Sequence, residues 1–294
     1  MSNFGADWLA MREPFDHAAR NRAVLGRVAA WARGRDPITI TDLGCGTGAN
    51  FRFLAPRLPP CRQRWLLIDH DPRLLEAAVT VTRRWARERG FRVTERDDGL
   101  DLSIRDRRWS IGCCCRSLVD EDDPVAYDGT DLVTASALLD LVSAGWFDRE
   151  ISLIWQAGAA QYWALTYDGR TVWSPSAPED GRILDLFNRH QLGNKGFGPA
   201  LGPGAAARLA ATASTEQRAR WGPSDWTVGP DAASFQLAVV EGIARAATEA
   251  ASGAGPEIRR WLETRRTAVA QGRSRLTVGH RDAFLPPPEP LERD

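Results

Sequence analysis

The sequence predicts an α/β fold in which a mostly parallel sheet carries helices on both faces. Short apolar, β-branched runs at 38–43, 65–68 and 130–134 alternate with longer segments of helical periodicity. Strand–helix–strand–helix repeats of this kind build parallel sheets. A glycine-rich turn follows the first run, at the edge where open parallel sheets bind their ligands. The pattern therefore directs the search for a ligand site to residues 42–50.

The elements can be assigned in chain order. The chain opens with a helix over 14–33 that has Pro14 near its first turn. We then expect a strand at 38–43, a helix at 49–58, a strand at 65–69, a helix at 72–89, a hairpin within 91–117, a strand at 130–134, a helix beginning near Ala137 and a strand at 162–167. Helices at 232–251 and 256–271 precede a last strand at 275–279.

The domain organisation follows from these elements. We expect an N-terminal helical lid (1–35), one main domain (36–285) and a disordered tail (286–294) that begins with three prolines. Residues 170–223, rich in Gly, Pro and Ala, are an insertion of one or two helices that covers the substrate.

Composition excludes several classes of protein. The 294 residues contain 38 basic and 38 acidic side chains, and 43% of residues are hydrophobic. This balance excludes global disorder and argues against nucleic acid as the main partner. The start has no signal-peptide pattern, and the longest uncharged stretch, 151–167, is too short and too polar to span a membrane. We expect a cytoplasmic protein with a small-molecule partner and no membrane partner.

Cysteine and histidine spacing does not predict a metal site. The five cysteines lack paired metal-clip spacing, and three of them are consecutive at 113–115. We expect buried, reduced thiols. The four histidines also lack ligand spacing, so no required metal is expected.

The run DLGCGTGAN at 42–50 carries the chemistry. Its glycines allow close approach of a ligand to the backbone, and the helix behind it presents unpaired N–H groups. Asp69 ends the next strand, where a carboxylate can accept the hydroxyls of a ribose. The spacing of Gly44, Gly46 and Ala49 also fits the dinucleotide pattern G-x-G-x-x-G/A, so a nicotinamide cofactor stays an alternative.

The order acidic-x-Gly-x-Gly-x-Gly resembles motif I of class I S-adenosylmethionine-dependent methyltransferases. LIDHDP at 67–72 resembles that family's second strand with its ribose-binding acid, and DLVTASALLD at 131–140 resembles its fourth strand and substrate-facing loop. The resemblance covers about residues 38–168. It implies a Rossmann-like fold with a seven-stranded sheet, and S-adenosyl-L-methionine as cofactor.

The resemblance also implies roles for individual residues. Asp42 would help to hold the amino group, Asp69 the ribose, Ser117 and Leu118 the adenine, and the backbone of Ala135 the amino-acid end. Ser117 departs from the acid that many members carry there. The glycine turn would line the methionine and ribose through Gly44, Cys45, Gly46 and Gly48. Arg20 would meet the cofactor carboxylate if the N-terminal helix forms a lid, although Arg12, Asp16 and Arg20 also suit an ion-pair ladder.

The acceptor side is less defined. Asp140 and His190 are the candidate catalytic residues, and Lys195, Trp146 and His17 the candidate substrate-binding residues. Lys195, the only lysine, lies in a glycine-rich loop and suits a carboxylate or phosphate. Trp146, Trp163 and Trp173 are candidates for an aromatic cage.

Methyl transfer to a small, polar, anionic metabolite by in-line displacement is the function that the sequence favours. The loop after the fourth strand lacks the Asn/Asp-Pro-Pro-Tyr/Phe motif of nucleic-acid amine methylation. Three alternatives stay open: aminocarboxypropyl transfer or cyclisation with release of methylthioadenosine, an NAD(P)-dependent oxidoreductase, and a non-catalytic cofactor-binding protein.

Overall fold

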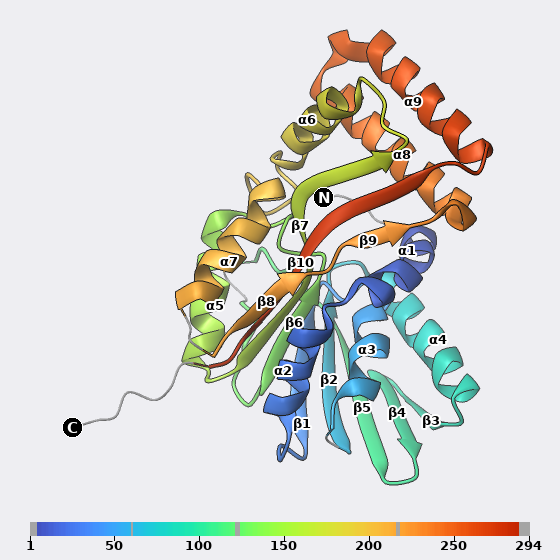
Figure 1. Cartoon of the computed structure of the whole chain (residues 1–294). Coiled ribbons are helices and arrows are strands. Elements are labelled where there is room, and N and C mark those ends of the chain that lie inside the picture. The colour runs from blue at the N-terminus through green and yellow to red at the C-terminus, as the bar shows by residue number, and fades with distance from the viewer. Residues whose placement is uncertain (1–4, 60, 121–123, 216–217, 288–294) are drawn as a thin grey trace.

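A mixed ten-stranded sheet forms the centre of the computed structural model, which describes residues 5–59, 61–120, 124–215 and 218–287 (Figure 1). Within these ranges the strands are β1 (Ile38–Leu43), β2 (Arg62–Asp69), β3 (Arg92–Arg96), β4 (Gly99–Ile104), β5 (Arg107–Cys115), β6 (Leu132–Ser136), β7 (Ala160–Ser174), β8 (Arg220–Pro223), β9 (Trp226–Val228) and β10 (Arg275–Leu285). Their order is β3-β4-β5-β2-β1-β6-β7-β10-β8, and β9 pairs with β10.

The strand directions confirm the predicted Rossmann-like α/β fold. β5, β2, β1, β6 and β7 are mutually parallel neighbours, and β10 runs antiparallel to both β7 and β8. The run from β5 to β8 has the seven strands expected, although β8 lies in the segment for which only helices were expected. The hairpin predicted within 91–117 joins its edge, because β4 pairs with both β3 and β5. This extension, together with β9, makes the described sheet larger than the seven strands expected.

The helices of the described ranges agree with the predicted periodicity, with two corrections. They are α1 (Ala6–Ala19), α2 (Arg22–Ala32), α3 (Ala49–Leu54), α4 (Pro72–Glu88), α5 (Ala144–Gln156), α6 (Asp180–Gln191), α7 (Ala205–Thr215), α8 (Ala233–Ala250) and α9 (Gly255–Ala270). The single helix expected at 14–33 is two helices, and Pro14 lies inside α1 rather than near the start of a helix. The helix expected near Ala137 begins only at Ala144, because Ser143 caps it by accepting from the Trp146 N–H.

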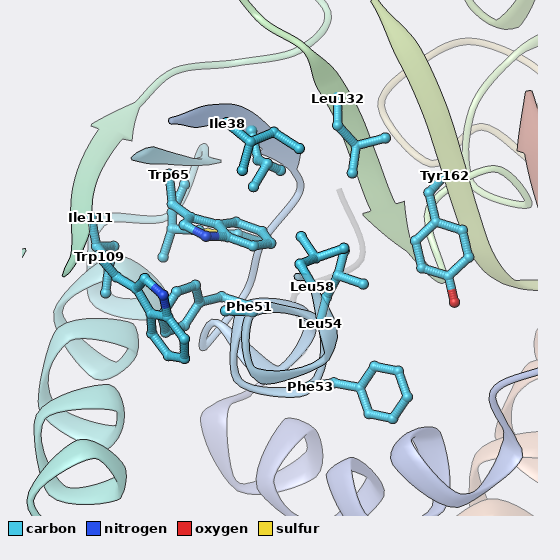
Figure 2. Close-up of a cluster of buried hydrophobic side chains, with 14 of the residues drawn as sticks. Ile38, Phe51, Phe53, Leu54, Leu58, Trp65, Trp109, Ile111, Leu132 and Tyr162 are labelled. Atoms are coloured by element: carbon cyan, nitrogen blue, oxygen red, sulfur yellow. The ribbon is translucent and has the colours of Figure 1, made fainter. Parts of the chain in front are cut away.

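The first face of the sheet is covered by α2, α3 and α4, which bury one aromatic-rich cluster (Figure 2). Phe51 of α3 meets the Trp65 ring of β2 edge to face, with centroids 5.1 Å apart, a favourable geometry for aromatic pairs. Trp109 of β5 and Leu132 of β6 belong to the same cluster. This packing fixes α3, and with it the glycine turn, against the ends of the strands.

The opposite face and a helical cap complete the molecule. α5 and α7 bury a second cluster against the other face of the sheet. α6, α8 and α9 bury a third cluster around the far ends of the long strands β7 and β10, which extend beyond the sheet in Figure 1. The insertion predicted at 170–223 is therefore divided, since α6 belongs to the cap and α7 to the sheet. Of the predicted tail, residues 288–294 lie outside the described ranges.

Candidate functional site

The turn after β1 is shaped by glycines in the left-handed region. Gly44 and Gly46 have φ of 60° and 54°, values that favour glycine. A Cβ on Gly46 would lie 3.0 Å from Leu9 Cδ1, and one on Gly44 would lie 3.3 Å from Leu138 Cδ1. The turn therefore accepts no side chain without displacing its neighbours.

Asp69 closes this turn from the next strand. Its carboxylate accepts the Gly46 N–H at 2.9 Å and the Asp71 N–H at 3.0 Å. The side chain is buried and lines a small cavity at the carboxyl ends of β1 and β2. Each carboxylate oxygen has two lone pairs, so both keep capacity for a ligand hydroxyl.

This cavity, which we call the turn cavity, encloses about 140 Å³. Its lining includes Gly44, Gly46, Asp69, Ser117, Leu118 and Ser136. Ligand pockets typically measure about 300–1,000 Å³, so the turn cavity is small for a nucleoside. Leu9 of α1, which lines it above Gly46, is the side chain that narrows it.

A second, larger cavity adjoins the first between the sheet edge and the cap. This cap cavity encloses about 590 Å³. Aromatic walls come from Trp8, Tyr167, Phe187 and Trp226, and polar groups from Arg12, Asp140, His190, Lys195 and His280. Both cavities are lined by Arg12, Ala137, Leu141 and Lys195. The two chambers thus meet at a shared wall, as a site for two reactants requires.

The wall that the two cavities share contains a non-glycine residue with positive φ. Ala137, which follows β6, has φ of 54°, and its N–H donates to the Ala164 carbonyl at 2.9 Å. Left-handed backbone outside glycine is uncommon and concentrates at functional sites. It turns the chain so that Ser136 and Ala137 line the turn cavity, whereas Ala135, expected to face the cofactor, is buried one residue earlier.

Asp140 lies in the loop between β6 and α5, on the wall of the cap cavity. Its Oδ1 is buried without a hydrogen-bond partner among the described residues. Burial raises the pKa of this carboxyl, and Arg12 and Lys195 oppose that rise. The unpartnered Oδ1 can accept a hydrogen bond from a bound molecule.

His190 and Lys195 are brought together as neighbours. Lys195 Nζ lies 3.3 Å from His190 Nδ1, and His190 Nε2 lies 2.9 Å from Glu249 Oε2. Burial lowers the pKa of Lys195. Both His190 and Lys195 line the cap cavity.

His280 is a polar group of the site that sequence reasoning missed. Its Nδ1–H donates to the Val278 carbonyl at 3.1 Å, and burial lowers the pKa of the ring to about 3. The ring also packs against Trp226, with centroids 4.9 Å apart. The sequence signal was weak, because the last strand was expected to end at Gly279 whereas β10 continues to Leu285.

Asp42 and Arg20 lie behind the turn cavity and do not line it. Asp42 is fully buried and accepts from Asn50 Nδ2 at 2.8 Å, and burial raises its pKa to about 7. Arg20 Nη2 donates to Asn50 Oδ1 and to Ser136 Oγ, both at 3.0 Å. Arg20 thus contacts Ser136, which lines the turn cavity. That the Asp42 carboxylate or the Arg20 guanidinium contacts a cofactor stays a prediction.

Several expected site residues support the site from outside the cavities. Cys45 is buried, and a Cβ on Gly48 would meet Arg52 and Thr82, so these positions serve packing. His17 Nε2 lies 3.0 Å from the Ala49 carbonyl oxygen and joins α1 to α3. These three residues line neither cavity.

The expected aromatic cage is wrong. Trp146, Trp163 and Trp173 are buried in the core and line neither cavity. The Trp146 indole N–H donates to the Leu118 carbonyl at 2.7 Å. Trp146 therefore holds the backbone of a residue that lines the turn cavity. Trp8 and Trp226 occupy the aromatic positions instead.

Helix α1 covers both cavities. Glu13 pairs with the buried guanidinium of Arg52, and Arg12 forms a 2.9 Å ion pair with Asp16. Asp16 also accepts the Trp226 indole N–H at 3.0 Å. The predicted ion-pair ladder therefore exists between the first two of its three members, while Arg20 turns away to Asn50.

All five thiols are free, but only Cys45 is buried, and Cys115 is exposed. Within the described ranges no three His, Cys, Asp or Glu side chains come together as metal ligands would. In the same part of the chain, no helix has the length and apolar character needed to cross a membrane.

Comparisons with known proteins give distant structural likenesses. No protein-family model matches the chain, and no curated protein matches it. A SAM-dependent methyltransferase from Geobacter sulfurreducens in complex with S-adenosyl-L-homocysteine is 16% identical with a TM-score of 0.41, covering 97% of this chain and 100% of that one. One from Thiobacillus denitrificans, with the same ligand, is 13% identical with a TM-score of 0.44 and covers 97% and 99%. YcgJ from Bacillus subtilis is 15% identical with a TM-score of 0.45 and covers 91% and 100%.

Proposed function

We propose that the chain binds S-adenosyl-L-methionine in the turn cavity and catalyses transfer of its methyl group to a small molecule in the cap cavity. The observation that carries this proposal is the pair of adjoining cavities at the carboxyl edge of the sheet. One of them has the glycine turn and Asp69 in its wall, and the other has aromatic and ionisable walls. Open α/β sheets bind ligands at this edge.

The residues present fit the cofactor. The side-chain-free turn at Gly44 and Gly46 admits close approach of a ligand, and Asp69 keeps lone pairs for ribose hydroxyls. Ser117 and Leu118 lie in the same wall and would flank the adenine. When bound, the sulfonium supplies an electrophilic methyl carbon. The chain's part is to align the acceptor with it across the shared wall and to exclude water.

The lining of the cap cavity supports an outline of the acceptor. Aromatic walls suit a flat or apolar body, and the ionisable lining is mixed, with Arg12, Lys195 and Arg245 against Asp140 and Glu241. This mixture does not single out the anionic acceptor expected from Lys195 alone. We propose a small molecule with polar substituents, and the zero formal net charge supports such a partner over a nucleic acid. A cytoplasmic location is part of this proposal.

Calorimetry with S-adenosyl-L-homocysteine tests the cofactor assignment. We expect heat of binding to the wild type and no comparable heat with NADH. Binding of NADH alone would instead favour the oxidoreductase alternative. Binding of neither would overturn the proposal.

The reaction is tested by its by-product. The protein is incubated with S-adenosyl-L-methionine carrying a labelled methyl group and with a pool of small metabolites, and the products are identified by mass spectrometry. Methyl transfer predicts S-adenosyl-L-homocysteine together with a labelled acceptor. Methylthioadenosine would show aminocarboxypropyl transfer or cyclisation, and tight binding without turnover would favour a non-catalytic binding protein.

A further inference from the structure

The line of side chains Lys195, His190 and Glu249 connects the shared wall of the cavities to the surface. Lys195 Nζ and His190 Nδ1 are 3.3 Å apart, and His190 Nε2 and Glu249 Oε2 are 2.9 Å apart. Lys195 lines both cavities, whereas the Glu249 side chain is 58% exposed. The three groups come from the loop after α6, from α6 and from α8.

Hydrogen bonding in this line has a direction. A carboxylate can only accept, so the 2.9 Å contact requires a proton on His190 Nε2. In the neutral ring Nδ1 then has a lone pair, which accepts from Lys195 Nζ. Each of the two contacts thus joins one donor to one acceptor, and together they form a path from Nζ to the exposed Glu249 carboxylate.

We propose that Lys195 is the base that takes the proton from the acceptor, and that His190 and Glu249 form a relay that carries this proton to the surface. This rests on the proposed function. It also defines the acceptor class as a molecule whose reacting nitrogen or oxygen carries a proton at neutral pH, such as a protonated amine or a hydroxyl.

The N–H or O–H bond of the acceptor breaks, and its proton bonds to the lone pair of neutral Lys195 Nζ. The electron pair left on the acceptor bonds to the methyl carbon, while the carbon–sulfur bond breaks and its pair stays on sulfur. Nζ then passes a proton to His190 Nδ1, and Nε2 releases one to Glu249 and water.

Burial and the neighbouring acids act on the charge of Lys195 in opposite directions. Partial burial disfavours the ammonium, and the acids Glu249 of α8 and Asp140 of the β6–α5 loop favour it. Arg12 of α1, Arg245 of α8 and His190 of α6 are further ionisable groups that line the cap cavity with Lys195.

The single lysine allows a direct test by nuclear magnetic resonance. Protein labelled with ¹⁵N at the lysine side chain gives one side-chain signal, which belongs to Lys195. We expect its titration midpoint below the value of about 10.4 of an exposed lysine. Glu249→Gln removes an anion that favours the ammonium and should lower the midpoint further. Glu88→Gln, at a side chain of similar exposure (63%) on α4, is the matched control and should leave the midpoint unchanged.

The ¹⁵N signals of His190 give the second readout, because they show which ring nitrogen carries the proton. A histidine with only a structural role could adopt either tautomer. The relay requires a protonated Nε2 and an unprotonated Nδ1. A protonated Nδ1 in the neutral ring, an exposed-type lysine midpoint, or equal midpoints in Glu249→Gln and Glu88→Gln would each overturn the proposal. S-adenosyl-L-homocysteine calorimetry on the same samples separates the two ideas, since absence of binding rejects the proposed function whatever the spectra show.

Discussion

Asp69 is the side chain on which cofactor affinity should depend most. It accepts two backbone N–H groups and still faces the turn cavity. Asp69→Ala removes charge-assisted hydrogen bonds to the ribose and should weaken binding of S-adenosyl-L-homocysteine by about 1–3 kcal/mol, measured by calorimetry. Asp71→Asn is the control, because Asp71 caps α4 through the Arg73 N–H and does not line the cavity. Unchanged affinity in Asp69→Ala would reject the ribose assignment.

Asp42 is expected to make the fold less stable as the pH rises. Burial raises its pKa to about 7, whereas in the unfolded chain it is about 3.9. The folded state therefore holds this proton more tightly, and that contribution is complete below about pH 4 and lost as the pH rises through 7. Relative to Asp42→Asn, the wild type should lose roughly 2–4 kcal/mol of unfolding free energy between pH 4 and 8, measured by urea denaturation.

The Asp42 measurement needs a control variant at a neighbouring residue that carries no charge. Thr134 Oγ1 accepts from the same Asn50 amide at 3.1 Å, so Thr134→Val should lower stability by a similar amount at each pH. Parallel pH curves for the wild type and Asp42→Asn would show that Asp42 ionises normally in the fold.

At the level of single residues, the sequence motifs located the turn cavity better than the cap cavity. Gly44, Gly46 and Asp69 are fixed by local strand–turn–helix geometry, which a motif encodes. Trp146 was misplaced because the direction of a tryptophan side chain depends on what packs against its helix. Here that partner is the Leu118 backbone and the Phe197 ring, 28 and 51 residues away in sequence.

Helix α1 should control entry to the turn cavity. Leu9 lies over Gly46 and narrows a cavity of about 140 Å³. Leu9→Ala removes this obstruction and should raise the association rate of S-adenosyl-L-homocysteine several-fold, measured by stopped-flow fluorescence. Met11→Ala on the same helix changes a side chain that is 38% exposed and lines neither cavity, so its rate should match the wild type. A Leu9→Ala rate equal to the wild-type rate would mean that α1 is not the barrier.

The error of expecting one helix over 14–33 has a tertiary cause. Asn21 separates α1 from α2, because its side chain caps α2 and its N–H donates to Asp282 Oδ2 at 2.9 Å. Asp282 lies 261 residues away in the chain, and periodicity within 14–33 contains no sign of it. The strand–helix alternation of the sheet was predicted because each unit buries its own apolar stripe, whereas the break depends on a distant acid.

At the scale of the molecule, His280 in the wall of the cap cavity should make the fold less stable in acid. It lies where β10 passes the cap cavity, against the rings of Trp226 and Tyr167, and Arg12 helps to keep it neutral. Its pKa is lowered to about 3 in the fold against about 6.5 in the unfolded chain. Its contribution to stability is therefore present above pH 6.5 and lost as the pH falls towards 3. Between pH 7 and 4 the wild type should lose on the order of 2–3 kcal/mol relative to His280→Gln.

The measurement must be a difference between variants, because Asp42 acts in the opposite direction over an overlapping range. As the pH falls from 7 to 4, Asp42 adds stability while His280 removes it, and the wild-type curve shows only their sum. Urea denaturation of His280→Gln should therefore reveal a fold that gains stability in acid, and Asp42→Asn one that loses it more steeply than the wild type. Thr171→Val, in the same cavity wall without a titratable group, should keep the wild-type slope. If His280→Gln also keeps that slope, the imidazole is not held neutral at the junction of cap and sheet.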